Sequence, residues 1–331
     1  MKHRLNLHFY TVLKLFIIAS IAPLSGCGGD SKSTQSIQQA QVSSYAASVS
    51  SDGHYSVMSD SSGSISVWDL FKQQEIYLWK QQNDNHVFIT RIAADNEYVV
   101  TASRQDFAIW SLTDGQAQGY WSIAESNIRD IAISSNARYV LIGLVNGKVL
   151  HLDLDTGRRL EFLGHSEKIN SVALSPNGRY ALTGGNDYQA LLWDTQSAQI
   201  ILRFPQSSRV SMVALDDSGQ YAFTADSGKQ ARIWSIPSGE LVSELNLIAR
   251  QTLFTSVQFS ADQQWLVTGS AARKVGLWRV SDGKQLAQYM VSPKRKTRPE
   301  SAVVYSAAAV DGTQIISASS SGLVEYWPIS Q

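Results

Sequence analysis

Cysteine is nearly absent from this chain, which has 331 residues and a single cysteine, Cys27. One cysteine cannot form a disulfide within the chain. Zinc binding in the usual cysteine and histidine patterns is excluded as well, because the histidines beyond residue 26 are widely spaced: His54, His86, His151 and His165. The sequence also lacks the P-loop pattern and the Gly-x-Ser-x-Gly elbow of serine hydrolases. We therefore expect no cofactor, no metal and no catalytic residue.

The first 26 residues have the composition of a secretory signal. The chain begins with basic residues and continues with an apolar stretch at 15–22 that is too short to span a membrane. The next four residues, Leu24-Ser25-Gly26-Cys27, resemble the bacterial lipobox. That resemblance implies cleavage before Cys27 and acylation of its thiol and its new amino group. The alternative is an ordinary cleavage site that happens to contain cysteine.

We predict three parts: a signal peptide at 1–26, the lipidated Cys27 with a flexible tether at 27–36, and a repeat domain at 37–331. The tether is polar and rich in Gly and Ser, as flexible linkers are. In enteric-type bacteria an Asp directly after the acylated cysteine favours the inner membrane, and here Gly28 occupies that place. We therefore expect a lipid anchor in the outer membrane, facing the periplasm. Several acyl chains on one cysteine would hold the domain firmly.

An aromatic or histidine anchor recurs at nearly constant spacing through the rest of the chain. Intervals of 42, 41, 42, 41, 44 and 49 residues separate Trp68, Trp110, His151, Trp193, Trp234, Trp278 and Trp327. A second series keeps step with the first, at Tyr55, Tyr98, Tyr139, Tyr180, Tyr221, Trp265 and Ile315. Turn-forming pairs such as Asn177-Gly178 precede the second series. Each unit therefore predicts short strands joined by tight turns.

The fourth unit, Gly164 to Asp194, is the most complete copy. Runs typical of strands lie at 169–174, 180–183, 191–193 and, just beyond the unit, 199–204. Gly164-His165 at the start, Trp193-Asp194 at the end and a period of about 40–45 residues make the chain resemble the WD40 family. The resemblance implies an all-β fold, a seven-bladed β-propeller with four-stranded antiparallel blades.

In WD40 blades a His, a Ser or Thr, an Asp and a Trp form a hydrogen-bonded tetrad. The matching residues here are His165, Thr183, Asp187 and Trp193. A buried polar group without a partner costs about 1–3 kcal/mol, so a structural role is sufficient for all four. A catalytic His–Asp pair is the alternative. The other units lack the full tetrad and are expected to rest on apolar packing, with the third, which has His151 in place of Trp, the least stable.

The last unit ends four residues after Trp327 and has no fourth strand of its own. WD40 rings usually close by lending an N-terminal strand to the last blade, and Ile37 to Gln41 is the segment placed to do so. Closure would remove the strand edges that could otherwise pair with other chains.

Charge is balanced over the whole chain, with 28 basic and 28 acidic residues. Three of the basic residues and none of the acidic ones lie in the predicted signal, which leaves a formal net charge of −3 and gives no sign of nucleic-acid binding. In WD40 rings the loops between blades share one face with the turns between second and third strands. We predict a basic partner-binding face there, formed by Arg209, Arg250, Arg273, Lys274, Lys294, Arg295, Lys296 and Arg298. The alternative is that these are solvated loop charges with little individual effect.

We therefore expect a membrane-anchored, non-catalytic protein-interaction scaffold of the bacterial cell envelope, with other envelope proteins as partners. Two alternatives remain open: a binder of a small anion or a glycan in the central channel, and a propeller hydrolase. Hydrolysis would require carboxylates or a His–acid pair converging at the channel mouth, and the sequence predicts none. Because one fold can host many functions, the function has to be argued from the residues of the site.

Overall fold

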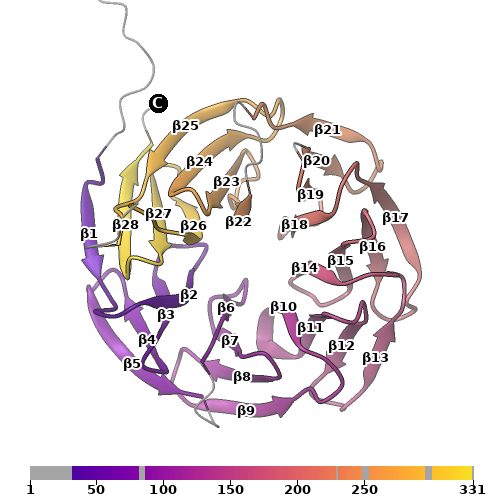
Figure 1. Cartoon of the computed structure of the whole chain (residues 1–331), viewed down its shortest axis with the longest axis horizontal. Coiled ribbons are helices and arrows are strands. Elements are labelled where there is room, and N and C mark those ends of the chain that lie inside the picture. The colour runs from indigo at the N-terminus through magenta and orange to yellow at the C-terminus, as the bar shows by residue number, and fades with distance from the viewer. Residues whose placement is uncertain (1–31, 82–85, 229, 248–252, 295–299, 330–331) are drawn as a thin grey trace, which may run out of the picture.

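Seven antiparallel sheets of four strands, arranged as the blades of a ring, make up the fold (Figure 1). The computed structural model describes residues 32–81, 86–228, 230–247, 253–294 and 300–329. Within these residues the helical structure is one short 3₁₀ turn, η2 (Ser135–Ala137). The prediction of an all-β, seven-bladed propeller is confirmed.

The first six blades each use four consecutive strands. Blade 1 contains β2 (Ser44–Val49), β3 (Tyr55–Asp60), β4 (Ser64–Asp69) and β5 (Gln74–Lys80). Blade 2 contains β6 (Ile89–Ile92), β7 (Tyr98–Ala102), β8 (Asp106–Ser111) and β9 (Ala117–Ser122). Blade 3 contains β10 (Ile128–Ile133), β11 (Tyr139–Leu144), β12 (Val149–Asp153) and β13 (Arg159–Phe162).

The second half of the ring repeats this order. Blade 4 contains β14 (Ile169–Leu174), β15 (Tyr180–Gly185), β16 (Gln189–Asp194) and β17 (Ile200–Pro205). Blade 5 contains β18 (Val210–Leu215), β19 (Tyr221–Asp226), β20 (Ala231–Ser235) and β21 (Leu241–Glu244). Blade 6 contains β22 (Phe254–Phe259), β23 (Trp265–Ser270), β24 (Lys274–Arg279) and β25 (Gln285–Met290). The first strand of each blade lies beside the central channel and the fourth at the rim (Figure 1).

Blade 7 is completed from the other end of the chain. It contains β26 (Val304–Val310), β27 (Gln314–Ser319), β28 (Leu323–Pro328) and, as its outermost strand, β1 (Gln35–Gln38). Ile37 of β1 lies opposite Val324 of β28. Closure by an N-terminal strand is thus confirmed, but the strand begins two residues before the predicted segment, Ile37 to Gln41. Pairing ends at Gln38 because the chain then turns inward, where the Gln39 N–H donates to the Gly322 carbonyl at 2.8 Å.

Aromatic side chains join neighbouring blades. All seven predicted anchors lie on the third strand of a blade. In four places a ring from the fourth strand of one blade packs against the anchor of the next, with ring centres 4.2–5.4 Å apart: Trp79 on Trp110, Phe162 on Trp193, Phe204 on Trp234 and Tyr289 on Trp327. A buried aromatic side chain removes about 150–250 Å² from water, so these contacts supply much of the cohesion between sheets.

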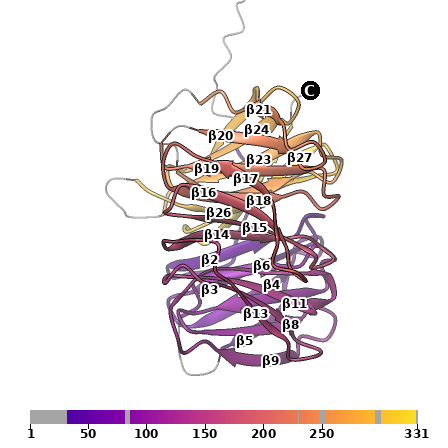
Figure 2. The ribbon, with the colours of Figure 1, turned by 90° about the vertical axis from the view of Figure 1, so that its right-hand side faces the viewer.

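The connections between strands lie on two opposite faces of the ring (Figure 2). The loops between blades share one face with the turns between second and third strands, because the two sets are hydrogen-bonded, as from the Ser227 N–H to the Arg209 carbonyl at 2.8 Å. This loop face comprises 39–43, 61–63, 86–88, 103–105, 123–129, 145–147, 163–168, 186–188, 206–209, 227–228, 245–247, 253, 271–274, 291–294, 300–303 and 320–322. The opposite, or turn, face carries the first-to-second and third-to-fourth turns, tied by bonds such as Thr195 N–H to the Arg179 carbonyl at 2.9 Å.

Candidate functional site

The four residues of the predicted tetrad lie together in blade 4. His165 Nδ1 is 2.9 Å from the nearer Asp187 oxygen, His165 Nε2 is 2.9 Å from Thr183 Oγ1, and Trp193 Nε1 donates to that hydroxyl at 3.3 Å. The His165 side chain is fully buried, and that of Asp187 is 8% exposed. Burial opposes ionisation of Asp187, but the hydrogen-bonded His165 ring outweighs it and lowers the pKa of the carboxyl. The arrangement ties a loop to its blade, and a substrate has no access to the buried pair.

Most blades keep a hydroxyl beneath the anchor tryptophan. The indole N–H donates to it at 2.8–3.3 Å in the pairs Trp110–Thr101, Trp193–Thr183, Trp234–Thr224, Trp278–Thr268 and Trp327–Ser317. The hydroxyl therefore satisfies a buried donor that would otherwise destabilise the blade.

Glutamine takes the place of His165 in blades 2 and 5. The Thr101 hydroxyl donates to Gln81 Oε1 at 2.9 Å, and Gln206 Nε2 donates to Thr224 Oγ1 at 3.2 Å. Neither glutamine was predicted from the sequence. A signal was available for one of them, since Gln206 precedes Thr224 by 18 residues, as His165 precedes Thr183.

Blades 1 and 3 lack the hydroxyl, and their anchors keep unpaired ring nitrogens. Met58 and Leu141 stand ten residues before Trp68 and His151, where blades 4 to 7 have Ser or Thr; in blade 2 the Thr stands nine residues before the anchor. In the described part of the chain no hydrogen-bond partner reaches Trp68 Nε1 or either ring nitrogen of His151. His151 is 2% exposed, and burial lowers its pKa although the nearby Gly178 backbone favours the charged ring. Blade 3 thus holds a buried imidazole that is most stable in its neutral form.

The eight residues of the predicted partner-binding face differ in their contacts and in whether the structure describes them. Two of them brace the chain itself. Arg273 Nε donates to the Val291 carbonyl at 2.9 Å, and its Nη1 lies 3.4 Å from a Glu300 oxygen. Lys294 Nζ donates to the Ser43 hydroxyl, which links the loop before blade 7 to the loop before blade 1. These two charges hold loops in place.

The other members divide into two groups. Arg209 is exposed and Lys274 half-buried on the loop face, and neither side chain has an ion-pair partner in the described segments. The remaining members lie outside the described residues: Arg250, Arg295, Lys296 and Arg298. Cys27, the predicted lipidation residue, also lies outside them. A basic face at blades 5 to 7 therefore stays a prediction.

Two further arginines stand close together on the loop face at blades 2 and 3. Arg104 lies in the turn between β7 and β8, and Arg129 on β10; both are exposed and without a carboxylate partner among the described residues. The Ile128 N–H donates to the Arg104 carbonyl at 2.6 Å, which joins the two backbones. The Arg104 guanidinium is 5.9 Å from the centre of the Phe88 ring. Phe88 is 43% exposed and Val145 is 42% exposed.

These four residues, Phe88, Arg104, Arg129 and Val145, are termed the arginine patch. They line a pocket of about 400 Å³, together with Asn127 and Ser103 among others. A second pocket of about 330 Å³ shares Phe88 and Arg129 with the first and extends to the mouth of the central channel. A partner could therefore meet charge, apolar surface and a hollow in one place.

The channel itself has its charges matched. Arg91 Nη2 lies 2.9 Å from Asp130 Oδ1, and Asp130 Oδ2 accepts the Val172 N–H at 3.0 Å. A cavity of about 220 Å³ lies between the first strands of the blades at this level. Because Asp130 compensates Arg91, the pair provides little net attraction for an anion.

Among the residues described, no three His, Cys, Asp or Glu side chains gather closely enough to hold a metal ion. In the same part of the chain, no helix is long and apolar enough to cross a membrane.

The comparison with known families agrees with this geometry. The sequence profile described as WD domain, G-beta repeat matches residues 157–194 and 247–279. The first match contains the complete tetrad of blade 4, and the second contains the Thr268–Trp278 pair of blade 6. The chain belongs to the WD40 β-propeller family. No curated protein matches the sequence of this WD40 propeller. WD40 propellers are typically non-catalytic and generally bind protein partners.

Proposed function

We propose that this WD40 propeller is a lipid-anchored, non-catalytic interaction scaffold of the bacterial cell envelope. The arginine patch on its loop face would be the docking site for another envelope protein. The observation that carries the proposal is the pairing of two uncompensated guanidinium groups with exposed Phe88 and Val145 over one pocket. Arginine and aromatic residues are the types that contribute most to protein interfaces.

The chemistry of the patch favours a protein segment with acidic and apolar side chains. A carboxylate placed between Arg104 and Arg129 would make charge-assisted hydrogen bonds to planar guanidinium groups. An apolar side chain could occupy the pocket beside Phe88. The patch stands on a backbone held by hydrogen bonds, such as Val145 N–H to the Asn127 carbonyl at 3.0 Å. Such a preorganised surface loses little entropy on binding.

The proposed location rests on the sequence alone. The Leu24–Cys27 segment resembles a lipobox, and residues 27–34, which begin with the acylated Cys27, lead to β1. At about 3.5 Å per residue these eight residues span less than ~28 Å, so β1, at the rim of blade 7, would stay near the membrane. A short tether of this kind would leave the loop face free to meet partners in the same membrane.

Charge reversal tests the proposed docking site. Arg104→Glu and Arg129→Glu should each reduce co-purification of envelope proteins after crosslinking in cells by roughly tenfold or more, since they replace attraction with repulsion. Arg203→Glu is the matched control: it makes the same change in charge on the exposed rim strand β17. Equal capture by all three variants would overturn the assignment of the site. Loss of capture by Arg203→Glu as well would indicate a nonspecific charge effect.

A further inference from the structure

Turns on the turn face are normally covered by the preceding blade. A methyl group on Gly178, in the first turn of blade 4, would overlap the Tyr139 ring of blade 3. A methyl group on Gly312 in blade 7 would lie 3.5 Å from Trp265 of blade 6, and one on Gly53 in blade 1 would lie 2.7 Å from Val310 of blade 7. In each case a side chain of one blade closes the gap to the next.

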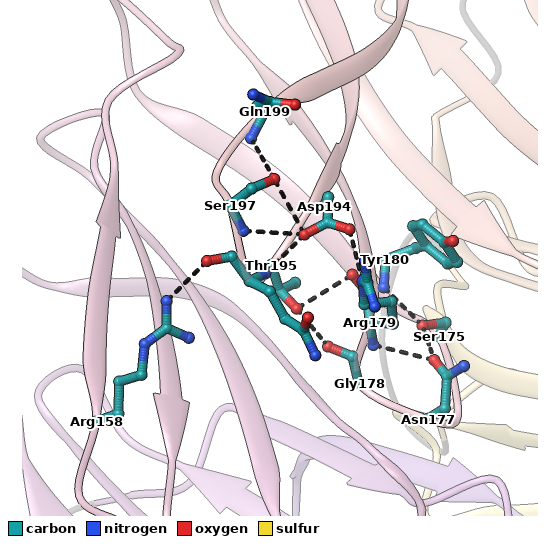
Figure 3. Close-up of polar contacts among 11 residues, drawn as sticks. Arg158, Ser175, Asn177, Gly178, Arg179, Tyr180, Asp194, Thr195, Ser197 and Gln199 are labelled. Carbon is teal, nitrogen blue, oxygen red and sulfur yellow. Dashed lines mark hydrogen bonds and ion pairs between the residues drawn. The ribbon is translucent and has the colours of Figure 1, made fainter.

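The junction between blades 4 and 5 departs from this rule. Gly219 occupies the same turn position in blade 5, and nothing lies within 4 Å of a methyl group built on it. The residue that should cover it is Tyr180, which is 41% exposed instead. Tyr180 stands on a rigid turn, where its N–H donates to Ser175 Oγ at 2.9 Å and Ser175 Oγ donates to Asn177 at 2.8 Å (Figure 3). The gap is therefore part of the fold.

A pocket of about 410 Å³ fills this gap. Its walls are mainly apolar and include Leu192, Ile201, Leu215 and Ile236. This volume falls within the ~300–1,000 Å³ range of ligand pockets, which are also lined mostly by apolar groups. Ile201 is 46% exposed at the edge of the pocket, so apolar surface continues beyond it. An occupant that covers this edge must be larger than the pocket.

Two aspartates, Asp216 and Asp217, line this pocket. Asp216 is committed to the turn and accepts the Tyr221 N–H at 2.6 Å. Asp217 has no cationic partner in the described part of the structure. Asp217 is exposed at the surface, but the groups packed around its carboxyl partly desolvate it and raise its pKa, and the Asp216 carboxylate adds to the increase. The nearby Arg179 is itself compensated by Asp194 at 2.5 Å.

We propose that this pocket between blades 4 and 5 is a second binding site, for a partner segment in which an apolar residue is followed by lysine or arginine. The apolar side chain enters the space between Tyr180 and Gly219, and the cation pairs with Asp217. Charge complementarity selects a basic partner, in contrast to the acidic segment expected at the arginine patch. The pocket lies on the opposite face of the ring from the arginine patch, so each of the two proposed binding sites can be tested independently of the other.

A peptide titration tests the site. The probe is the acetylated and amidated tetrapeptide Ala-Leu-Lys-Ala, followed in NMR spectra of the uniformly labelled propeller. We expect millimolar binding, with shifts confined to the amides of residues 175, 177–180, 201 and 215–219. Ala-Leu-Glu-Ala and Ala-Ser-Lys-Ala should bind at least two- to fivefold more weakly, because each lacks one of the two interactions. Equal shifts with all three peptides, or no shifts, would overturn the proposal.

Variants separate this site from a general effect of charge. Asp217→Asn should weaken binding of the Leu-Lys peptide two- to fivefold, whereas Glu240→Gln, an exposed acidic residue on the same face, should not change it. Ile201→Lys should abolish binding, whereas Leu241→Lys, 49% exposed on the rim of blade 5, should not. Arg104→Glu should leave it intact. If free n-hexylammonium binds as tightly as the peptide, the occupant is a small amine and the assignment to a protein segment is wrong.

Discussion

The buried imidazole of His151 makes a stability prediction that depends on pH. Its ring is 2% exposed and unpaired, and burial lowers its pKa. In the unfolded chain His151 takes up a proton below its ordinary pKa of about 6.5, whereas the folded protein resists protonation. The unfolded state therefore binds more protons as the pH falls, and stability decreases below that value. If the folded ring stays neutral throughout, lowering the pH from about 7.5 to about 5.5 removes ~1.4 kcal/mol.

Urea unfolding at the two pH values, with and without His151→Phe, isolates this contribution. The variant has no titrating group there, so the difference in unfolding free energy between variant and wild type should grow by up to ~1.4 kcal/mol at the lower pH. His86→Phe, a change at an exposed ring, should not reproduce that growth. If the difference stays constant, or shrinks as the pH falls, the folded ring accepts a proton and the reading of blade 3 is wrong.

Three further predictions concern other parts of the chain. Thr268→Val should destabilise the protein by about 1–3 kcal/mol in urea unfolding, because it leaves the Trp278 N–H without its 2.9 Å acceptor; unchanged stability would contradict the role given to the hydroxyls. Burial opposes ionisation of Asp194, but hydrogen bonds from the Ser197 N–H and Arg179 lower the pKa of its carboxyl to about 2. The carboxylate therefore contributes about 2 kcal/mol to the free energy of unfolding above pH ~4, and this contribution is lost as the pH falls towards ~2. Asp194→Asn should abolish that acid-dependent loss of stability. Cys27→Ser should release the propeller from membranes in fractionated cells, and retention would contradict lipid anchoring.

The ring could be predicted from sequence because its determinants are local. The third-strand anchors and the turns before the second strands repeat at one spacing, and each unit needs both to bury its sheet. The tetrad of blade 4 could be identified for the same reason, since His165, Thr183, Asp187 and Trp193 lie within one unit. Gln81 and Gln206 were overlooked because they perform the role of His165 with a different side chain.

Features that depend on contacts between blades could not be read from the sequence. Whether a basic residue is available to a partner depends on distant neighbours: Lys294 meets Ser43, which is 251 residues away, and Arg273 meets Glu300. Arg104 and Arg129 look no different in sequence from these two. Tyr139 and Tyr180 occupy the same repeat position, yet only Tyr139 covers the glycine of the next blade. The pocket beneath Tyr180 therefore emerges only from the folded chain.

The loop face as a docking surface can be tested directly by site-specific photo-crosslinking in living cells. A photoreactive residue in place of Asn127, which lines the arginine-patch pocket, should capture a protein partner, and adding Arg104→Glu should abolish the adduct. The same residue in place of Tyr120, exposed on rim strand β9 of blade 2, should capture nothing comparable. Equal adducts from both positions, or an adduct at Asn127 that survives Arg104→Glu, would contradict the account.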